Sequence, residues 1–207
     1  MELEKNLKWN EGKVWGTMIG AFGGCYAIRK TCHIPVPQNF LMDDFYISLN
    51  ALKRKKRAIM NMDAKCFEDV SDKIKEEFRR KVRISAGNFQ NLFAYTSLWL
   101  NPLSKTGFTF WSHKILRWIT PILLLGMFIS SYMLREHNAF YSFVFLAGIS
   151  LILITFAEIL LSKLSVNIKP LRFVTHFLGM NLALLLGFFK FLFGVRTNIW
   201  KPTERNQ

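Results

Sequence analysis

Residues 115–134 read ILRWITPILLLGMFISSYML, an apolar run in which Arg117 is the only charged side chain. An α-helix needs about 20 such residues to cross the hydrocarbon core of a bilayer. Two further runs of similar length follow at 139–161 and 173–193. The sequence therefore predicts a membrane region, 115–194, that holds about three apolar helices, followed by a tail, 195–207.

The connections between these runs predict their orientation. Only residues 135–138 join the first two runs, so the two helices should form a tight hairpin. Cytoplasmic segments of membrane proteins carry an excess of Lys and Arg. The segments 1–114 and 162–172 are both basic, so we expect a multi-pass protein of the cell membrane with residues 1–114 in the cytoplasm.

The tail conflicts with this orientation. Three helices would place it outside, yet it carries Arg196, Lys201 and Arg205. Either the tail departs from the charge rule, or one run lies in the membrane interface or re-enters. The second alternative is favoured, because His176 and Lys190 are costly at the centre of a bilayer.

The composition narrows the classes of partner. Lys and Arg number 28 against 14 Asp and Glu, which predicts a polyanionic partner such as nucleic acid, anionic lipid or a phosphorylated substrate. With 51% hydrophobic residues and 20 Phe, the chain is unlike a soluble nucleic-acid binder, so no nucleic acid is expected. The three cysteines show neither zinc-site nor CxxC spacing, which suits a reducing compartment.

Residues 1–114 are interpreted as a mixed α/β segment. A glycine cluster at 20–24 precedes a strand-like run, and AIMNM at 58–62 predicts a second short strand. A helix is expected after Asp43, ended by the basic run 53–57, and a longer one over 71–93. The longer helix has an apolar stripe made of Ile74, Phe78, Val82, Ala86, Phe89 and Phe93.

Asp43 and Asp44 stand at the start of the first of these helices. Acidic residues there are favoured by the helix dipole, and Asp is a good N-cap, so one explanation is purely structural. The other is catalytic, because a neighbouring carboxylate and partial burial can raise the pKa of an Asp and make it a useful general base. The pair alone does not decide between them.

The longer helix has a polar face as well. Arg80, Arg83, Gly87 and Gln90 recur on one side, away from the apolar stripe. Two guanidiniums one turn apart can bind a phosphate or pyrophosphate, and a glycine beside them leaves room for a ligand. The alternative is a basic surface helix beside anionic lipid headgroups.

The order of these motifs along the chain resembles a known family. The motifs are GAFGGCYAIRK at 20–30, MDDF at 42–45, DAKCFED at 63–69, RRKVRISAGNFQ at 79–90, SHKILRW at 112–118 and GVRTNIWKPTER at 194–205. Together they resemble the C-terminal part of the membrane-bound family 2 glycosyltransferases, which include the cellulose, chitin, hyaluronan and poly-N-acetylglucosamine synthases. These enzymes transfer sugars from nucleotide-sugar donors with inversion at the sugar.

The resemblance implies a fold and a set of roles. Residues 1–114 would be the C-terminal portion of an α/β glycosyltransferase-A-like domain. Asp44 would be the general base, and Asp43 the acid beside it. Of the family's Q-x-x-R-W motif this chain retains Arg83, while Arg80 replaces the Gln and Ile84 the Trp. The missing Trp argues against a strictly processive synthase.

Gly87 and Gln90 match the family's continuation after this motif. With the two arginines they would bind substrate diphosphate. The implied partners are a nucleotide-sugar donor, a glycan or lipid-linked acceptor, and membrane lipid.

The resemblance also implies a donor-binding half whose metal-binding motif is not found in this sequence. The family's donor half carries a metal-binding D-x-D, and no D-x-D occurs here. We therefore expect Mg²⁺ or Mn²⁺ in the intact enzyme, with ligands outside this chain, and, if the enzyme is split, a separate chain carrying that half. The chain alone is then expected not to transfer sugar. The alternative function is a non-catalytic basic membrane protein that binds anionic lipid or a partner chain.

Overall fold

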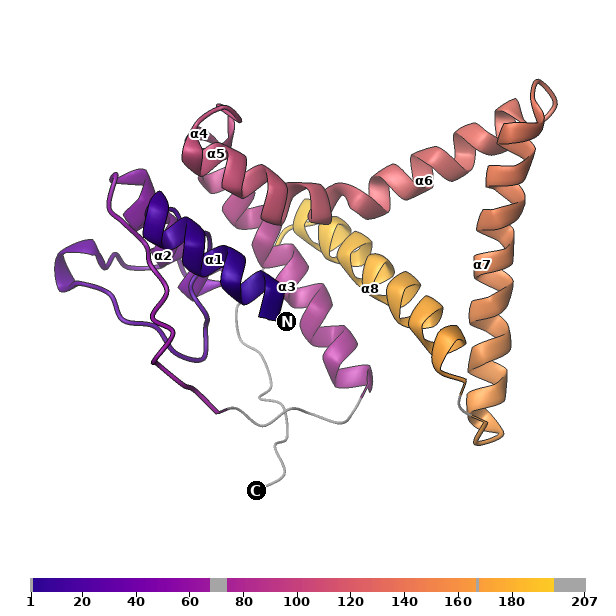
Figure 1. The fold of residues 1–207 in the computed structure, drawn as a ribbon, viewed down its shortest axis with the longest axis horizontal. Helices are drawn as coiled ribbons and strands as arrows, with labels where there is room; N and C mark the ends of the chain where they lie inside the picture. The colour runs from indigo at the N-terminus through magenta and orange to yellow at the C-terminus, as the bar shows by residue number, and fades with distance from the viewer. Residues whose placement is uncertain (1, 68–73, 167, 196–207) are drawn as a thin grey trace. The chain divides into compact units, whose positions relative to one another are not determined.

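The computed structural model describes residues 2–67, 74–166 and 168–195, and its regular elements in those ranges are helices (Figure 1). The chain divides into two compact units. The first contains residues 1–118 and 187–207, and the second contains residues 119–186. The expected tail, 195–207, lies outside the described residues except for its first position.

The prediction of an α/β glycosyltransferase-A-like domain is wrong. In the described ranges there is no strand, and the only β pairing is an isolated parallel bridge between Thr17 and Ala58. Met18 N–H donates to the Ala58 carbonyl at 3.2 Å, and Ala58 N–H donates to the Gly16 carbonyl at 2.8 Å. A sheet needs pairing along several residues and several strands, and the segment 58–62 contributes only this bridge.

The first unit is helical instead. Its elements are α1 (Glu2–Val14), the 3₁₀ turn η1 (Lys30–Cys32), α2 (Asp43–Lys53), α3 (Ile74–Ala94), α4 (Thr96–Trp99), α5 (Lys105–Phe110) and the π turn η2 (Trp111–Ile115). As predicted, α2 begins at the acidic pair and ends at the basic run, an arrangement that complements the helix dipole at both ends. The predicted long helix is α3.

An aromatic cluster forms the core of this unit. Trp118, only 1% exposed, meets Phe45, Phe89 and Phe110 with ring centroids 5.9 to 6.3 Å apart. Phe45 and Phe110 also contact each other edge to face. Edge-to-face pairs are favourable beyond the area they bury. The cluster therefore fixes the start of α2 against α3 and against the residues on either side of the η2 turn.

The last turn and a half of α8 (Lys169–Leu192) completes the same unit. Gly187 lies so close to α3 that a Cβ there would be 2.3 Å from Ser85 Cβ and 2.7 Å from the Val82 carbonyl oxygen. Beyond it, Phe188 packs on Phe89, with ring centroids 5.0 Å apart. Helices approach this closely only where one of them carries no side chain.

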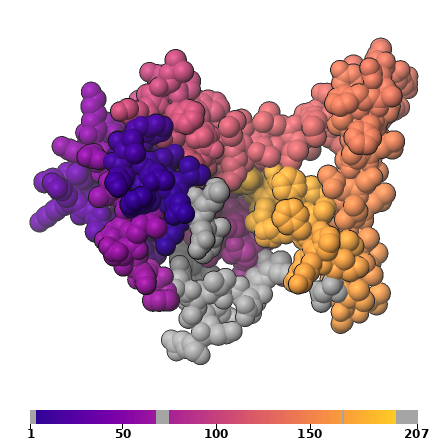
Figure 2. All heavy atoms as spheres, in the orientation of Figure 1, coloured from indigo at the N-terminus to yellow at the C-terminus, as the bar shows by residue number. Residues whose placement is uncertain are grey.

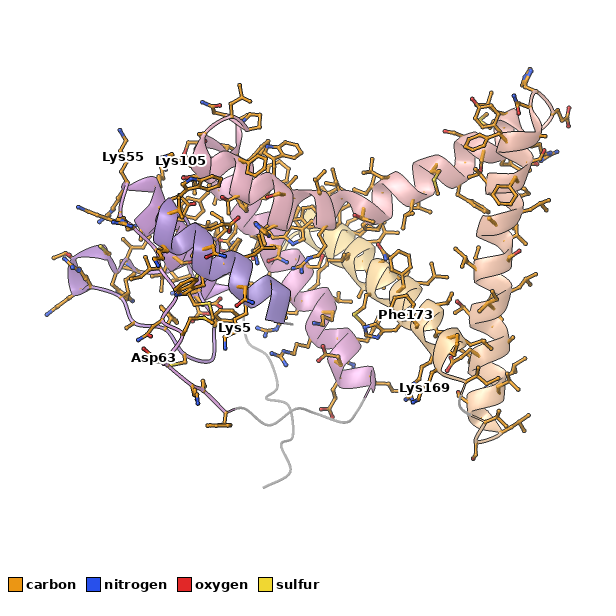
Figure 3. The ribbon with its side chains drawn as sticks, in the orientation of Figure 1. Lys5, Lys55, Asp63, Lys105, Lys169 and Phe173 are labelled. Atoms are coloured by element: carbon orange, nitrogen blue, oxygen red, sulfur yellow. The ribbon has the colours of Figure 1, made fainter. Side chains whose placement is uncertain are left out.

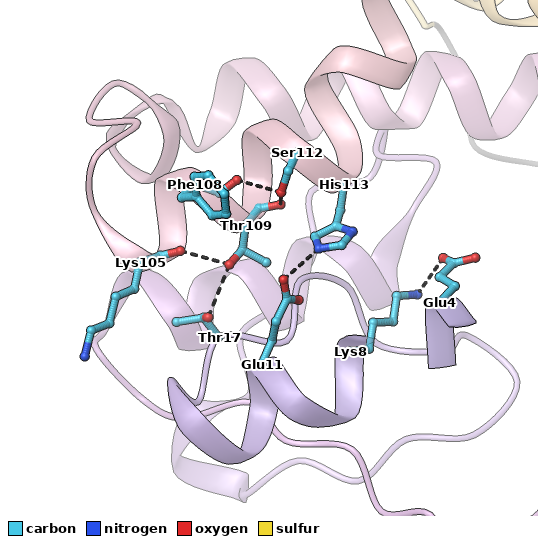
Figure 4. A network of polar contacts seen from close by, with 9 residues as sticks. All are labelled: Glu4, Lys8, Glu11, Thr17, Lys105, Phe108, Thr109, Ser112 and His113. Atoms are coloured by element: carbon cyan, nitrogen blue, oxygen red, sulfur yellow. Dashed lines mark hydrogen bonds and ion pairs between the residues drawn. The ribbon is translucent and has the colours of Figure 1, made fainter. Parts of the chain in front are cut away.

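Polar contacts connect α1 to η2 and the segment just after α1 to α5 (Figure 4). Glu11 Oε1 and His113 Nε2 are 2.7 Å apart, and the Thr17 and Thr109 hydroxyls are 3.5 Å apart. In the space-filling view, the indigo atoms of α1 lie at the front of this unit (Figure 2). The N-terminal helix is thus bonded to the η2 turn, although 102 positions separate Glu11 from His113.

The second unit contains most of the long apolar helices. It includes α6 (Leu116–Leu134) from residue 119, α7 (Ala139–Lys163), and α8 up to residue 186. As predicted, residues 135–138 join α6 and α7, and the Asn138 side chain caps α7 by accepting from Phe140 N–H at 2.9 Å. Phe128 of α6 contacts Phe145 of α7 and packs over Gly148.

Three helices in the described ranges are long and apolar enough to cross a membrane: Lys105–Leu134, Ala139–Lys163 and Lys169–Leu192. Many of their large apolar side chains are exposed, including Phe143, Leu153 and Phe173. Figure 3 draws the side chains along these helices and labels Phe173. Apolar side chains around a whole helix are typical of a membrane span. The three predicted apolar segments are present as helices.

Candidate functional site

The acidic pair lies in the first turn of α2, as predicted. Met42 occupies the N-cap position and makes no side-chain cap hydrogen bond. Asp44 Oδ1 instead accepts from Phe45 N–H at 2.8 Å. One oxygen of Asp44 therefore helps to begin the helix, as the structural explanation requires, and the role of the other oxygen depends on what faces it.

The glycine-rich loop 20–24 faces that second oxygen. A Cβ on Gly23 would lie 2.7 Å from Asp44 Oδ2, closer than real Cβ contacts come. Gly20 adopts a φ of +82° and lies against the Phe45 ring. The loop backbone thus comes close to Asp44 at Gly23 and to Phe45 at Gly20. This close approach explains why the loop is glycine-rich.

The surroundings of Asp44 favour its protonated form. Burial is the largest cause and raises the pKa of its carboxyl, and the negative charge of Asp43 raises it further. The Phe45 N–H lowers it in part. Burial and then the two carboxylates also raise the pKa of the Tyr26 phenol. Tyr26 therefore lies within electrostatic reach of the acidic pair, which sequence spacing could not reveal.

Arg83 of α3 lies near the same acidic pair. Its Nη1 donates to the Leu41 carbonyl at 3.4 Å, just before α2 begins. Burial and then Arg80 lower the pKa of its guanidinium, whereas the carboxylates of Asp43 and Asp44 raise it. The structure thus brings a predicted phosphate-binding arginine within electrostatic reach of the predicted base, although 39 positions separate Asp44 from Arg83.

Arg80 is more exposed than Arg83. Its Nη1 is 3.9 Å from the Glu77 carboxylate one turn earlier on α3, and about half of its side chain is open to solvent. A surface ion pair of this kind contributes little to stability. Arg80 is therefore able to turn toward a ligand at low cost.

The other two predicted binding residues contact the loop 39–42. A Cβ on Gly87 would lie 2.5 Å from Met42 Cγ, so the space beside this glycine is filled by that side chain. Gln90 is buried, accepts from Leu41 N–H at 3.1 Å and donates to the Asn39 carbonyl at 2.8 Å. Both residues fix the loop that precedes Asp43. Of the four polar positions, the two arginines are those available to bind a ligand.

Lys114 of η2 is a member of the site that the sequence reasoning missed. Its Nζ lies 5.6 Å from the centre of the Phe45 ring and 3.6 Å from the position of a Cβ on Gly20. It interacts electrostatically with Asp44. The sequence signal is SHKILRW at 112–118, one of the motifs that carry the family resemblance.

A metal site is not formed by the described residues. No three His, Cys, Asp or Glu side chains gather there as metal ligands, and Asp43 and Asp44 alone are two carboxylates without a third.

Comparisons with known proteins add no assignment to this geometry. No family model, no curated protein sequence and no solved structure matches the chain significantly.

Proposed function

We propose that this chain is part of a membrane-bound enzyme that transfers a sugar from a nucleotide-sugar donor to a glycan or lipid-linked acceptor. The proposal rests chiefly on one observation. Asp44 combines a carboxyl of raised pKa, a glycine loop packed against its Oδ2, and a partly buried arginine nearby. A base whose pKa is shifted toward the working pH and a cation for a leaving phosphate are the groups that such a transfer needs.

In the proposed reaction, Asp44 accepts the proton of an acceptor hydroxyl as the hydroxyl oxygen attacks the anomeric carbon of the donor sugar. The new bond from carbon to oxygen forms as the bond from that carbon to the diphosphate breaks. The bonding electrons leave with the nucleoside diphosphate. Attack from the face opposite the leaving group inverts the configuration at the anomeric carbon.

The arginines of α3 would act on the leaving group. Arg83 is partly buried, so its interaction with an anion is weakly screened by water. Arg80 is one turn away and could provide the second guanidinium of a diphosphate site. Both lie on the same helix that packs against the start of α2. Charge that develops on the diphosphate would then be stabilised beside the base.

We further propose that the first unit lies on the cytoplasmic side of the cell membrane. Three helices are long and apolar enough to span the bilayer, and the first of them, Lys105–Leu134, includes η2. The first unit is rich in exposed lysines, among them Lys5, Lys55 and Lys105 (Figure 3). Basic segments next to membrane spans are retained in the cytoplasm.

The test is sugar transfer by membranes from the native host carrying genomic Asp44→Asn. Wild-type membranes should incorporate sugar from a labelled nucleotide-sugar pool, and the variant should lose about 10²–10⁴-fold of this activity. Asp63→Asn is the matched control, because Asp63 is exposed in a loop (Figure 3). The control should keep full activity at equal protein level.

A non-catalytic lipid-binding protein would give another result. Transfer would then be equal in wild type, Asp44→Asn and Asp63→Asn, and that equality would rule out the proposed reaction. Under the same alternative, Arg83→Lys should leave membrane association unchanged, because charge rather than geometry attracts lipid. In a diphosphate site, the same change should reduce transfer, since a lysine cannot form the paired hydrogen bonds of a guanidinium.

A further inference from the structure

The first unit contains a second group of cations beside Asp44, separate from the arginines of α3. Lys114 of η2 interacts electrostatically with Lys8 of α1 and with Arg117 at the start of α6. The acidic residues that act on it are Glu4 and Asp44. Lys114 thus lies within electrostatic reach of two other cations and of two carboxylates, and one of these carboxylates is the proposed base.

Two of these cations are already engaged or solvated. Lys8 is 7% exposed; its Nζ is 3.2 Å from a Glu4 carboxylate oxygen and 4.5 Å from the centre of the Phe22 ring. Arg117 is exposed. Their positive charges therefore need no further partner, and they add to the positive potential around Lys114.

Lys114 is different. Its ammonium is largely removed from water between the Phe45 ring and the backbone at Gly20, and no hydrogen bond or ion pair joins it to any residue in the described ranges. An ammonium withdrawn from water without a hydrogen-bonded anion is unfavourable. Folding would avoid this cost with an apolar residue at position 114. A ligand that supplies the missing anion explains why a lysine is found there.

We propose that Lys114, supported by Lys8 and Arg117, binds a phosphate group of a monoester or diphosphate. An ammonium is a compact point charge with three donors, suited to phosphate oxygens. Lys114 and Arg117 lie in the N-terminal half of the first candidate membrane helix, Lys105–Leu134. The phosphate could therefore belong to a membrane lipid or to a water-soluble molecule. The site goes beyond the proposed transfer reaction, because binding there requires no turnover.

The test uses the full chain in a non-ionic detergent and two phosphate sources. Inorganic pyrophosphate represents the soluble source, and farnesyl phosphate in the micelle represents the lipid source. Binding is followed by ¹³C NMR of ¹³Cε-labelled lysines, in which the Lys114 signal is identified by its loss in Lys114→Gln. We expect at least one source to shift that signal in a saturable manner and to raise Tm.

The variants separate a binding role from a structural one. Lys114→Gln should weaken binding of the active phosphate source by about tenfold or more, because it removes a charged hydrogen-bond donor. Without ligand its Tm should equal or exceed that of the wild type. Lys105→Gln, an exposed position on the same continuous helix, should change neither property. Lys114→Met is the second variant should the glutamine disturb folding.

The two sources and the two proposals give distinguishable outcomes. Binding of pyrophosphate identifies a soluble ligand, whereas binding of farnesyl phosphate alone identifies a lipid. Asp44→Asn should bind phosphate as tightly as the wild type or more tightly, since it removes a nearby negative charge, so loss of transfer and loss of this site are separable. If neither source shifts Lys114, or if Lys114→Gln and Lys114→Met bind as well as the wild type, the inference is wrong.

Discussion

Asp44 is both the proposed base and a partly buried carboxyl whose oxygen accepts a hydrogen bond at the start of α2. The burial of this carboxyl should make the stability of the protein depend on pH. Burial raises its pKa, so between its unfolded and folded pKa values the folded chain binds more protons, and stability falls as pH rises. Asp44→Asn removes this cost. We expect a higher Tm than wild type at about pH 7, and a difference that disappears as pH falls below about 4, the ordinary Asp pKa.

Thermal unfolding in detergent across that pH range measures the effect. Asp63→Asn, at an exposed loop position, should follow the wild-type curve at every pH. A wild type more stable than Asp44→Asn at neutral pH would instead mean that attraction to Arg83 outweighs the effect of burial.

Gly23 gives a second prediction at the scale of single residues. An alanine there would place its Cβ 2.7 Å from Asp44 Oδ2. A carboxylate can rotate away more easily than a backbone can shift, so Gly23→Ala should fold with nearly unchanged Tm. The displaced base should lower sugar transfer by about tenfold or more, since small misplacements of catalytic groups are costly. Full activity in native membranes would show that Oδ2 does not need this position.

At the scale of elements, the close crossing of α3 and the end of α8 depends on Gly187, which has no side chain. Gly187→Ala would force its Cβ against Ser85 and the Val82 carbonyl, and overpacking of this kind costs about 1–3 kcal/mol. Gly179→Ala, on the same helix with nothing within 4 Å, should be neutral or stabilising by up to about 1 kcal/mol. Denaturant unfolding of both variants checks this, and equal stability would contradict the observed crossing.

The elements also show what the sequence could predict. The helices α2 and α3 and the apolar helices follow from local periodicity and charge, and they were predicted close to their observed bounds. The strands were predicted incorrectly, because a strand depends on partners elsewhere in the chain, and Thr17 and Ala58 make only one bridge. Spacing placed Gly87 and Gln90 on a polar face, but it could not show that residues 39–42 cover them.

At the scale of the whole molecule, the predicted orientation in the membrane can be measured with thiol reagents. Cys25 and Cys66 are exposed and Cys32 is buried. A membrane-impermeant maleimide should label the exposed pair in inside-out vesicles and not in intact cells. His137→Cys, in the exposed turn between α6 and α7, should show the opposite pattern. Labelling of Cys25 from outside the cell would reverse the proposed orientation.

The η2 turn has a consequence for comparing this chain with others. In a regular α-helix Phe110 and Ile115 would point about 140° apart, yet both are buried, because the wide turn holds one extra residue. The turn therefore accommodates one residue more than a regular α-helical turn, and the side chains before and after it still point to the same side of the helix. Deleting exposed Ser112 should leave the protein folded, whereas deleting Asn88 within α3 would rotate all later side chains by about 100°. Alignments with homologous chains should allow a single-residue gap at 111–115.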